Sequence, residues 1–268
     1  MLPQGVITSR HNPLVARFRS AVRGDLPDLI LLDGLHLIHD ALDARLVIRE
    51  AVVSRDARDR DEVRRLMLRL SEAGVETAHA TPSVMEAVSA VHSPAPIAAL
   101  AVRPSTDSSR MYAAADPLVV IAADVQDPGN LGAIVRVAEA AGATGAIVTG
   151  GSADPFGWKA LRGSMGSALR LPVGAEPDVE AAIRAARRAG CAIVATVPRN
   201  GRSLYETALS GATAVLVGGE GPGLPPAIVE AADIRVTIPM QSPVESLNAA
   251  VAAALVLYEV RRQRETES

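Results

Sequence analysis

The chain has 268 residues, of which 49% are hydrophobic and 21% are charged, and its formal net charge is −3. This composition excludes a disordered chain and a protein coated in positive charge, and the length favours two compact domains. No apolar run approaches the roughly 20 residues that span a bilayer, and the N-terminus lacks the pattern of a signal peptide. The single cysteine, Cys191, excludes an intramolecular disulfide and a thiolate metal cluster. We therefore expect a globular, cytoplasmic protein in which Cys191 is a buried strand residue.

The first hundred residues predict a small α/β domain, because predicted strands alternate with predicted helices. Asn12-Pro13 predicts the start of a basic helix, since proline is favoured in the first helical turn. The polar stretch 103–110, RPSTDSSR, predicts a linker, so the expected boundaries are 1–102, 103–110 and 111–268. After the basic helix we expect strand 29–34, helix 35–44, strand 48–54, helix 60–74, strand 75–80, helix 81–90 and strand 97–102.

The segment before Asp25 is basic, with Arg10, Arg17, Arg19 and Arg23 and no acidic residue. A local basic segment on a near-neutral protein is suited to the phosphates of a nucleic acid. A solvated terminal helix explains the same pattern equally well.

The second block predicts a buried parallel sheet. Residues 117–125, PLVVIAADV, form a continuous apolar run, which is typical of a strand covered on both faces. The elements that follow are helix 130–142, strand 145–150, helix 158–170, helix 178–190, strand 191–197, strand 212–220, helix 227–232, strand 234–239 and helix 246–265.

The first motif of this block is DVQDPGNLGAIVRVAEAAG, residues 124–142. Asn130 follows a Pro-Gly turn and is a good residue to cap the helix that begins there. Arg136 lies within an otherwise apolar stretch, and arginine is rarely buried without a partner. We therefore expect Arg136 to meet an anion or to line a cleft. The alternative is an arginine at the helix edge whose head group reaches solvent.

The second motif is AVLVGGEGPGLPP, residues 214–226. Glycines after a strand let a ligand approach the backbone closely, and Glu220 lies among them at the end of a parallel strand. The loop is neither a P-loop nor a dinucleotide fingerprint. An anionic Glu220 favours a cationic or hydroxyl-bearing ligand over a phosphate.

The third motif is IPMQSPVESLNAAVAAALVLYE, residues 238–259. We expect the final helix to start at Glu245 or Ser246 and to be apolar on all sides, which predicts a subunit interface. Ser246 and Asn248 are polar exceptions at its start, where they can reach a ligand or merely cap the helix.

These three motifs, in this order, resemble the SpoU-type (TrmH-like) branch of the SPOUT RNA methyltransferases. The matching residues are Asn130-Leu131-Gly132 with Arg136, Gly219–Leu224, and Ile238–Met240 with Ser246–Asn248. Residues 154–167 and 195–205 are weaker matches, and the likeness covers residues 117–260. The chain departs from the family pattern at Gly219, at Ser242 and at Asp33-Gly34, which leaves the class intact and blurs the substrate.

The resemblance implies an α/β fold. A trefoil-knotted methyltransferase domain follows a small α/β substrate-binding domain that resembles a ribosomal protein. It further implies bound S-adenosyl-L-methionine (SAM), a structured RNA as substrate, and a homodimer whose active site takes residues from both subunits. The catalytic positions are then Arg136, Asn130, Glu220, Ser246 and Asn248. The cofactor positions are Thr196, Gly218, Gly219, Ile238, Met240 and Leu247. The RNA-binding positions are Arg10, Arg17, Arg19 and Arg136.

The expected reaction moves a methyl group from SAM to a ribose 2′-hydroxyl. Positioning and removal of the hydroxyl proton are what such a reaction needs from the protein. Arg136 either binds the phosphate beside the ribose or acts as the base. The first role is physically easier, because arginine hardly loses its proton in proteins.

Several alternatives stay open at this point. Ribosomal RNA is the favoured substrate and transfer RNA the alternative, and a non-catalytic RNA-binding relative would keep the same fold. A nucleotide-binding oxidoreductase is disfavoured by the missing GxGxxG. His36 and His39 lie three residues apart on a predicted helix, but without a third ligand they do not predict a metal site.

Overall fold

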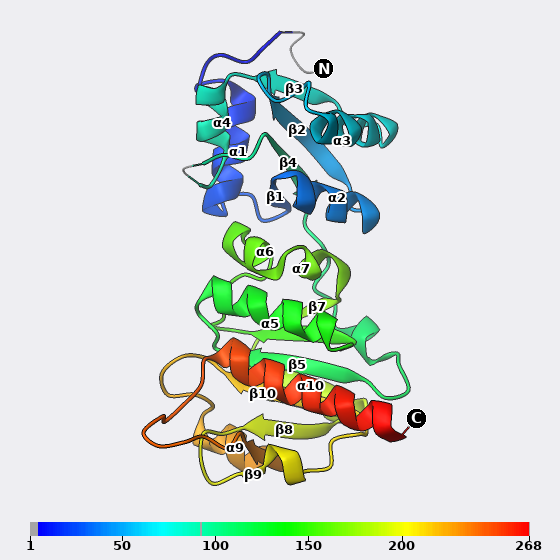
Figure 1. Ribbon diagram of the computed structural model, residues 1–268, viewed down its shortest axis with the longest axis vertical. Coiled ribbons are helices and arrows are strands. Elements are labelled where there is room, and N and C mark those ends of the chain that lie inside the picture. The colour runs from blue at the N-terminus through cyan, green and yellow to red at the C-terminus, as the bar shows by residue number, and fades with distance from the viewer. Residues whose placement is uncertain (1–4, 92, 268) are drawn as a thin grey trace. The chain divides into compact units, whose positions relative to one another are not determined.

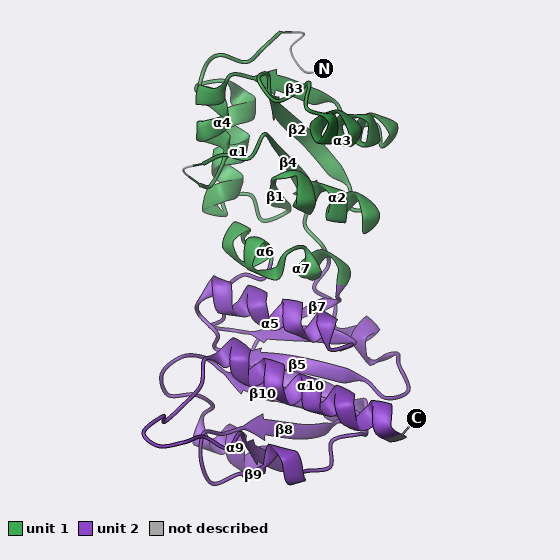
Figure 2. Cartoon of the chain, in the orientation of Figure 1, with its two compact units in different colours: residues 1–104, 156–170 green, residues 105–155, 171–268 purple. Residues whose placement is uncertain are grey.

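The computed structural model describes residues 5–91 and 93–267 (Figure 1). The chain divides into two compact units: unit 1 is Met1–Pro104 with Phe156–Arg170, and unit 2 is Ser105–Pro155 with Leu171–Ser268 (Figure 2). Within the described ranges, no helix is long and apolar enough to cross a membrane.

Unit 1 is built around a four-stranded sheet with the strand order β1-β4-β2-β3. Strand β4 pairs antiparallel with β1 and β2, whereas β2 and β3 are parallel. Helices α1 and α4 lie on one side of this sheet, and α2 and α3 lie on the other (Figure 1). The bounds are α1 Pro13–Arg23, β1 Leu29–Asp33, α2 Leu35–Asp43, β2 Ile48–Ser54, α3 Asp61–Glu72, β3 Thr77–Ala80, α4 Pro82–Val88 and β4 Ile97–Val102. The α/β alternation predicted for this part of the chain is confirmed.

Helix α1 begins where the sequence predicts. The Asn12 side chain accepts a hydrogen bond from the Leu14 amide, and Pro13 occupies the first turn. The buried face of α1 includes Phe18, which is fully inaccessible and packs in a core with Met85 of α4 and Leu100 of β4. Burial of such side chains leaves the arginines of α1 on its outer surface.

A helical segment between the second and third strands of unit 2 packs with unit 1. The sequence predicts one helix over 158–170, but the structure has two, α6 Trp158–Ser164 and α7 Ser167–Arg170. The break falls at Met165 and Gly166, which have φ of 50° and 81°. A side chain at Gly166 would collide with Asp40, whose carboxylate also pairs with Arg170 at 2.8 Å. The compact units therefore differ from the expected boundaries, because this segment was expected in 111–268.

Unit 2 contains a seven-stranded sheet with the strand order β7-β6-β5-β10-β8-β11-β9, in which every pair is parallel. The strands are β5 Leu118–Ala123, β6 Gly145–Thr149, β7 Val173–Glu176, β8 Ala192–Thr196, β9 Arg202–Ser203, β10 Thr213–Gly218 and β11 Ile234–Thr237. The parallel sheet was predicted, but the short strands β7 and β9 were not. The strands point the same way, so their carboxyl ends meet at one edge of the sheet.

Helices cover both faces of this sheet. Helices α5 and α10 pack side by side on one face (Figure 1), while α8 and α9 contribute to the core on the other face together with the short helix η1. Cys191 is buried as expected but lies one residue before β8 instead of within the strand, and burial raises the pKa of its thiol. The bounds are η1 Ser109–Tyr112, α5 Pro128–Ala140, α8 Val179–Arg188, η2 Leu204–Glu206, α9 Pro226–Ala231 and α10 Ala249–Glu267.

Candidate functional site

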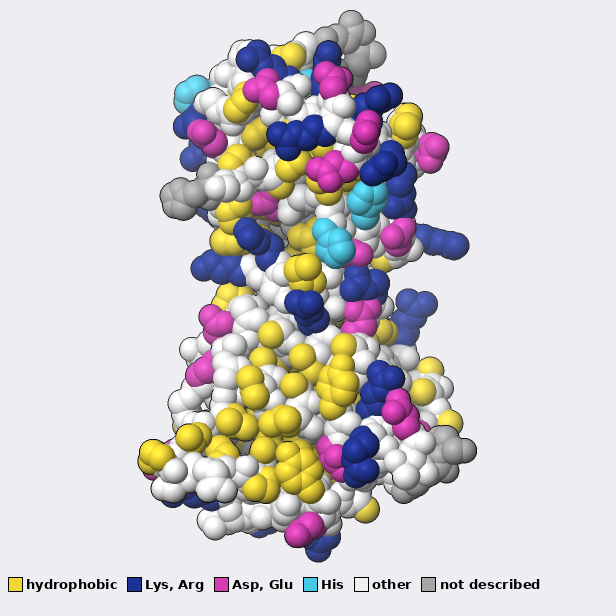
Figure 3. Space-filling model, viewed as in Figure 1, with side chains coloured by type: hydrophobic (Ala, Val, Ile, Leu, Met, Phe, Trp, Pro, Cys, Tyr) yellow, Lys and Arg dark blue, Asp and Glu magenta, His cyan; other side chains and the backbone are white. Residues whose placement is uncertain are grey.

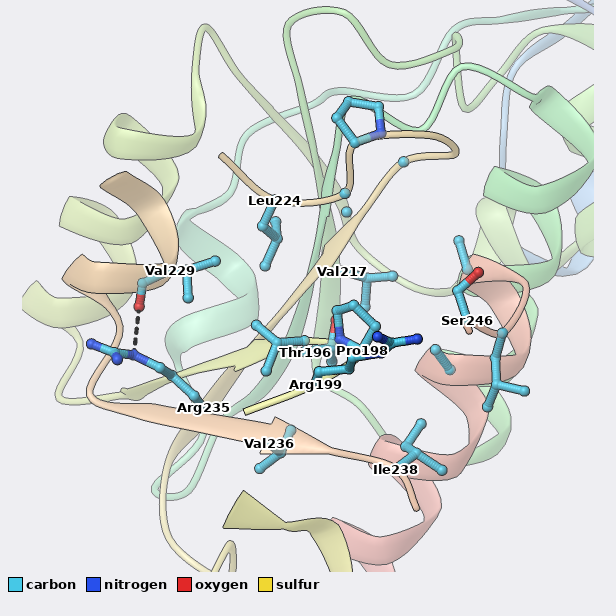
Figure 4. A pocket seen from close by; sticks show the side chains of 18 of the residues that line it. Thr196, Pro198, Arg199, Val217, Leu224, Val229, Arg235, Val236, Ile238 and Ser246 are labelled. Carbon is cyan, nitrogen blue, oxygen red and sulfur yellow. Dashed lines mark hydrogen bonds between the residues drawn. The ribbon is translucent and has the colours of Figure 1, made fainter. Parts of the chain in front are cut away.

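A pocket of about 800 Å³ lies in unit 2 where β8, β10 and β11 end, and the start of α10 completes its wall (Figure 4). Parallel sheets bind ligands at this edge because loops and strand ends surround a crevice there. Every residue that the family resemblance assigns to the cofactor lies in the pocket wall, namely Thr196, Gly218, Gly219, Ile238, Met240 and Leu247. The predicted catalytic residues Glu220, Ser246 and Asn248 also lie in this wall.

The glycine loop after β10 runs against the end of β5. The Gly219 amide donates to the Ala123 carbonyl at 2.8 Å, and a Cβ at Gly219 would lie 1.8 Å from the Asp124 carbonyl oxygen. No side chain fits at that position without moving backbone. Glycine therefore brings the second motif into direct backbone contact with the first.

Three polar side chains join the three motifs by hydrogen bonds. The Asn248 side-chain amide donates to the Asn130 side-chain oxygen at 3.0 Å, and the Asn130 amide in turn donates to the Glu220 carboxylate. Both Glu220 and Asn248 line the pocket, so these hydrogen bonds fix the Glu220 carboxylate at the pocket wall. An oriented carboxylate beside a pocket favours a cationic or hydroxyl-bearing ligand.

Asn130 is free to make these contacts because another residue caps its helix. Helix α5 begins at Pro128, and the Asp127 carboxylate caps it by accepting from the Asn130 backbone amide at 2.7 Å. The prediction that Asn130 itself opens the helix was wrong. The helix starts earlier, which leaves the Asn130 side chain in its first turn and available to Glu220 and Asn248.

The final helix also differs from its prediction. It begins at Ala249 instead of Glu245 or Ser246, and the Asn248 side-chain oxygen accepts from the Ala250 amide at 2.9 Å. Asn248 therefore does both things that the sequence allowed, because its oxygen caps the helix while its amide reaches Asn130. Ser246 and Leu247 stay in the preceding loop, where they line the pocket.

Arg136 does not reach the pocket of its own chain. It lies about 9 Å further along α5 than Asn130, given the rise of 1.5 Å per residue, and it is not among the residues of the pocket wall. Its side chain is exposed and makes no hydrogen bond or ion pair with residues 5–91 and 93–267. The structure of one chain thus groups Asn130, Glu220 and Asn248 and leaves Arg136 apart.

The N-terminal arginines of unit 1 are exposed, and three of the four pair with acidic residues, Arg23 with Asp25 at 2.7 Å. Arg10 pairs with Glu86 and Arg17 pairs with Glu50, each at 2.6 Å. Arg19 has no such partner in the part of the chain that the structure describes. The local positive charge of α1 is therefore partly neutralised within unit 1.

The two histidines of α2 take part in ordinary polar contacts. Arg69 approaches the His39 ring at 2.7 Å, and burial followed by the charge of Arg69 lowers the pKa of His39. His36 lies 3.6 Å from Asp40. The described residues contain no group of His, Cys, Asp or Glu side chains suited to hold a metal ion.

Sequence reasoning missed part of the pocket wall. Arg199 and Asn200 follow β8, and Val229 and Arg235 come from α9 and β11. The segment ATVPRNGRSLY, residues 195–205, was a weak match to the family and was the one signal for the first pair. Arg235 donates to the Val229 carbonyl at 3.1 Å (Figure 4).

Comparison with known proteins agrees with this architecture. Residues 117–258 match the SpoU rRNA Methylase family. The 23S rRNA (guanosine(2553)-2'-O)-methyltransferase RlmP of Bacillus subtilis is 32% identical over 231 residues, which are 86% of this chain and 88% of that protein. The chain therefore belongs to the SpoU rRNA methylase family.

Solved structures give the same class. An AdoMet-bound rRNA methyltransferase from Sinorhizobium meliloti superposes with a TM-score of 0.83 at 28% identity, covering 96% of this chain and 97% of that one. The A. aeolicus TrmH/SpoU tRNA modifying enzyme superposes with a TM-score of 0.51 at 30% identity, covering 59% of this chain and 81% of that one. The ribosomal RNA enzyme thus matches nearly the whole chain, and the transfer RNA enzyme matches little more than half.

Proposed function

We propose that this protein transfers a methyl group from SAM to a ribose 2′-hydroxyl of ribosomal RNA and works as a homodimer. Its family membership makes the chain a SAM-dependent RNA ribose methyltransferase. The observation that carries the site assignment is the hydrogen-bonded chain Asn248–Asn130–Glu220 at the wall of the pocket. These hydrogen bonds connect three sequence motifs that are far apart in the polypeptide and meet only in the folded protein.

The pocket fits SAM in its chemistry. Its wall combines apolar side chains with the glycine backbone of residues 218–223, which offers unshielded amide and carbonyl groups. When bound, SAM supplies a methyl group on a positively charged sulfonium. Gly218, Ile238, Met240 and Leu247 would hold the cofactor, largely through backbone groups, and Glu220 would lie near positive charge.

The protein's main task is positioning, because charge is neutralised as the methyl group moves and no oxyanion has to be stabilised. The two asparagines fix Glu220, and Ser246 adds a hydroxyl in the same wall. The carboxylate of Glu220 is then an acceptor that can orient a ribose hydroxyl.

We propose that Arg136 completes the pocket of the partner subunit. Helix α5 packs beside α10, whose outer surface exposes Val251, Leu255 and Tyr258 at 47%, 37% and 48%. These residues are spaced by four and three, so they form one apolar stripe, and hydrophobic side chains gather over α5 and α10 in Figure 3. A surface of this kind favours association with a second copy, which would carry the exposed Arg136 to another chain.

Ribosomal RNA is the better-supported substrate because the rRNA methyltransferases named above match almost the whole chain, unit 1 included. We propose that residues 1–102 bind this RNA, with Arg10, Arg17 and Arg19 on the surface of unit 1. We also propose a trefoil knot in the C-terminal half of residues 111–268. The tight passage of Gly219 against Asp124 supports it, since it brings the glycine loop onto the end of β5.

Methyl transfer from radiolabelled SAM to purified ribosomal and transfer RNA tests the function directly. We expect label in ribosomal RNA, in dinucleotides that resist alkali because the 2′-hydroxyl is blocked. Label in transfer RNA alone would contradict ribosomal RNA as the substrate. Label in dinucleotides that alkali cleaves would contradict the ribose 2′-hydroxyl as the methyl acceptor. No transfer to any RNA, with SAM binding intact, would favour a non-catalytic relative.

Mixing two inactive variants tests the shared site. Arg136→Ala and Asn248→Ala would each remove one chain's contribution. After random reassortment about half of the dimers would be mixed, each with one intact site, so about a quarter of the activity should return. Mixtures that stay inactive would place Arg136 and Asn248 in the same subunit's site.

A further inference from the structure

The pocket has two chemically different ends. Figure 4 shows Leu224, Val229 and Val236 toward one end and Arg199 and Ser246 toward the other. Arg235 lies at the first end too, with its guanidinium bonded to the Val229 carbonyl, and the apolar side chains beside it suit a flat aromatic ring system. The second end is polar and lies between the loop after β8 and the loop before α10, so a charged part of a ligand would lie there.

An ion pair joins these two loops at the polar end. Arg199, after β8, lies 3.2 Å from the carboxylate of Glu245, which precedes α10. Their side chains are 66% and 81% exposed. Exposed pairs of this kind are only weakly favourable, so either partner can exchange the other for a ligand of the same charge type at little cost.

Three other charged side chains line the pocket, and two of them, Arg235 and Glu220, make hydrogen bonds, whereas the third is the carboxylate of Glu230. Arg235 donates to the Val229 carbonyl, and Glu220 accepts from Asn130. In the described chain Arg199 is therefore the guanidinium of the wall that is held only by an exposed carboxylate. A zwitterionic ligand group would match this pair, with its anion on Arg199 and its cation on Glu245.

We propose that Arg199 and Glu245 form the subsite for the amino-acid tail of SAM, with Arg199 binding the α-carboxylate and Glu245 the α-ammonium. The inference rests on the proposed assignment of this pocket to the cofactor. Four alternating charges replace two when the tail binds, so no unpaired charge is left at the pocket mouth. The ligand then joins the two loops in place of the direct ion pair.

Calorimetric titration with two ligands isolates the tail. S-adenosylhomocysteine carries the complete amino-acid group, whereas 5′-methylthioadenosine lacks it and keeps the nucleoside. We expect Arg199→Ala to weaken S-adenosylhomocysteine about tenfold, the loss typical of a charge-assisted hydrogen bond, and to leave 5′-methylthioadenosine unchanged. Glu245→Gln should likewise weaken the binding of S-adenosylhomocysteine and leave that of 5′-methylthioadenosine unchanged.

Matched variants sharpen this titration. Arg202→Ala removes an exposed arginine three residues further on, outside the pocket wall, and should leave both ligands unchanged. Arg199→Lys keeps the charge and should recover part of the affinity for S-adenosylhomocysteine. The difference between the two ligands should also shrink as salt is raised, because the groups are exposed.

Two results would overturn the subsite. Equal effects of Arg199→Ala on both ligands would mean that it acts on the pocket as a whole. Unchanged S-adenosylhomocysteine affinity with weakened RNA binding would make Arg199 a contact for an RNA phosphate instead. If the unaltered protein binds neither ligand, the assignment of the pocket itself fails, which is distinguishable from both.

Discussion

Arginines that the family resemblance assigns to RNA are engaged differently in the two units. In unit 1, Arg10 and Arg17 lie in a basic run of sequence, yet each faces a glutamate at 2.6 Å. In unit 2, Arg136 is a single arginine in an apolar run, and it has no partner within the described chain. A basic run therefore overstates the charge available to an RNA, whereas an isolated arginine that the fold leaves exposed and unpaired is fully available to a phosphate.

The largest effect is expected at the unpaired arginine. Arg136→Ala should lower methyl transfer at least about 100-fold, because misplacing the reacting groups by an ångström can cost that much. SAM binding should survive, since Arg136 lies outside the pocket of its own chain. Single-turnover rates and calorimetric SAM binding measure the two effects separately.

Arg136→Lys separates the possible roles. Lysine keeps the charge but loses the planar fork that grips a phosphate in two places. If positioning dominates, lysine should be nearly as poor as alanine. If the group acts as a base, lysine should recover activity at high pH, and an alanine variant with normal turnover would contradict any catalytic role.

The next effect concerns the apolar stripe on α10. Val251→Asp should give monomers or aggregates, because burying an unpaired charge at an interface costs several kcal/mol. Methyl transfer should fall with it if Arg136 acts on the partner subunit. Light scattering at micromolar concentration measures the oligomeric state, and a monodisperse monomer of the unaltered protein would refute the proposed dimer. Val47→Asp, at an exposed valine of unit 1, makes the same change of side chain and charge away from α10 and should leave the oligomeric state unchanged.

How much the sequence could predict depended on the range of the interactions. The run 117–125 and the glycines 218–223 are local signals, and they predicted the parallel sheet and the pocket loop. At the break of 158–170 into α6 and α7, Gly166 lies against Asp40, which is more than a hundred residues away in the sequence. The pairing of Arg199 with Glu245 likewise depends on two distant loops meeting, which no local pattern contains.

Asn130 shows the same limit at the site. The family resemblance predicted a functional role for Asn130, but its helical position was misjudged because both Asp127 and Asn130 are good capping residues. Only the folded chain brings Glu220 and Asn248 to its side chain and so decides between the two caps.

A smaller effect is expected at Glu259, a buried carboxylate of α10. Glu259 is 6% exposed and accepts hydrogen bonds from Arg262 and Gln263, and the bonds from Arg262 chiefly lower its pKa. A lowered folded-state pKa contributes stability above the unfolded value, and this contribution is lost as the pH falls through the folded value. Glu259→Gln should therefore destabilise the protein by about 1–2 kcal/mol at pH 7.

The pH dependence provides the control for that variant. The free energies of unfolding of the two proteins, measured with urea, should converge as the pH falls below the folded-state pKa of Glu259, because both side chains are then neutral. A constant difference at every pH would mean that the substitution acts through packing and not through charge.

The smallest effect is expected in unit 1. Replacing Arg10, Arg17 and Arg19 together with alanine should weaken RNA binding about tenfold at most. It should also reduce the salt dependence, by a slope of roughly 0.7–0.9 for each phosphate that the protein no longer neutralises. Since Glu86 and Glu50 already neutralise two of these arginines, Glu86→Gln with Glu50→Gln should shift affinity in the opposite direction. Filter binding of ribosomal RNA fragments across a salt series measures both variants. If neither variant changes affinity or slope, α1 is a solvated helix and the RNA-binding surface of the protein lies elsewhere. If the glutamine variant strengthens binding while the alanine variant weakens it, the ion pairs of unit 1 compete with RNA phosphates for Arg10 and Arg17. Arg136 in unit 2, which has no partner within the described chain, meets no such competition.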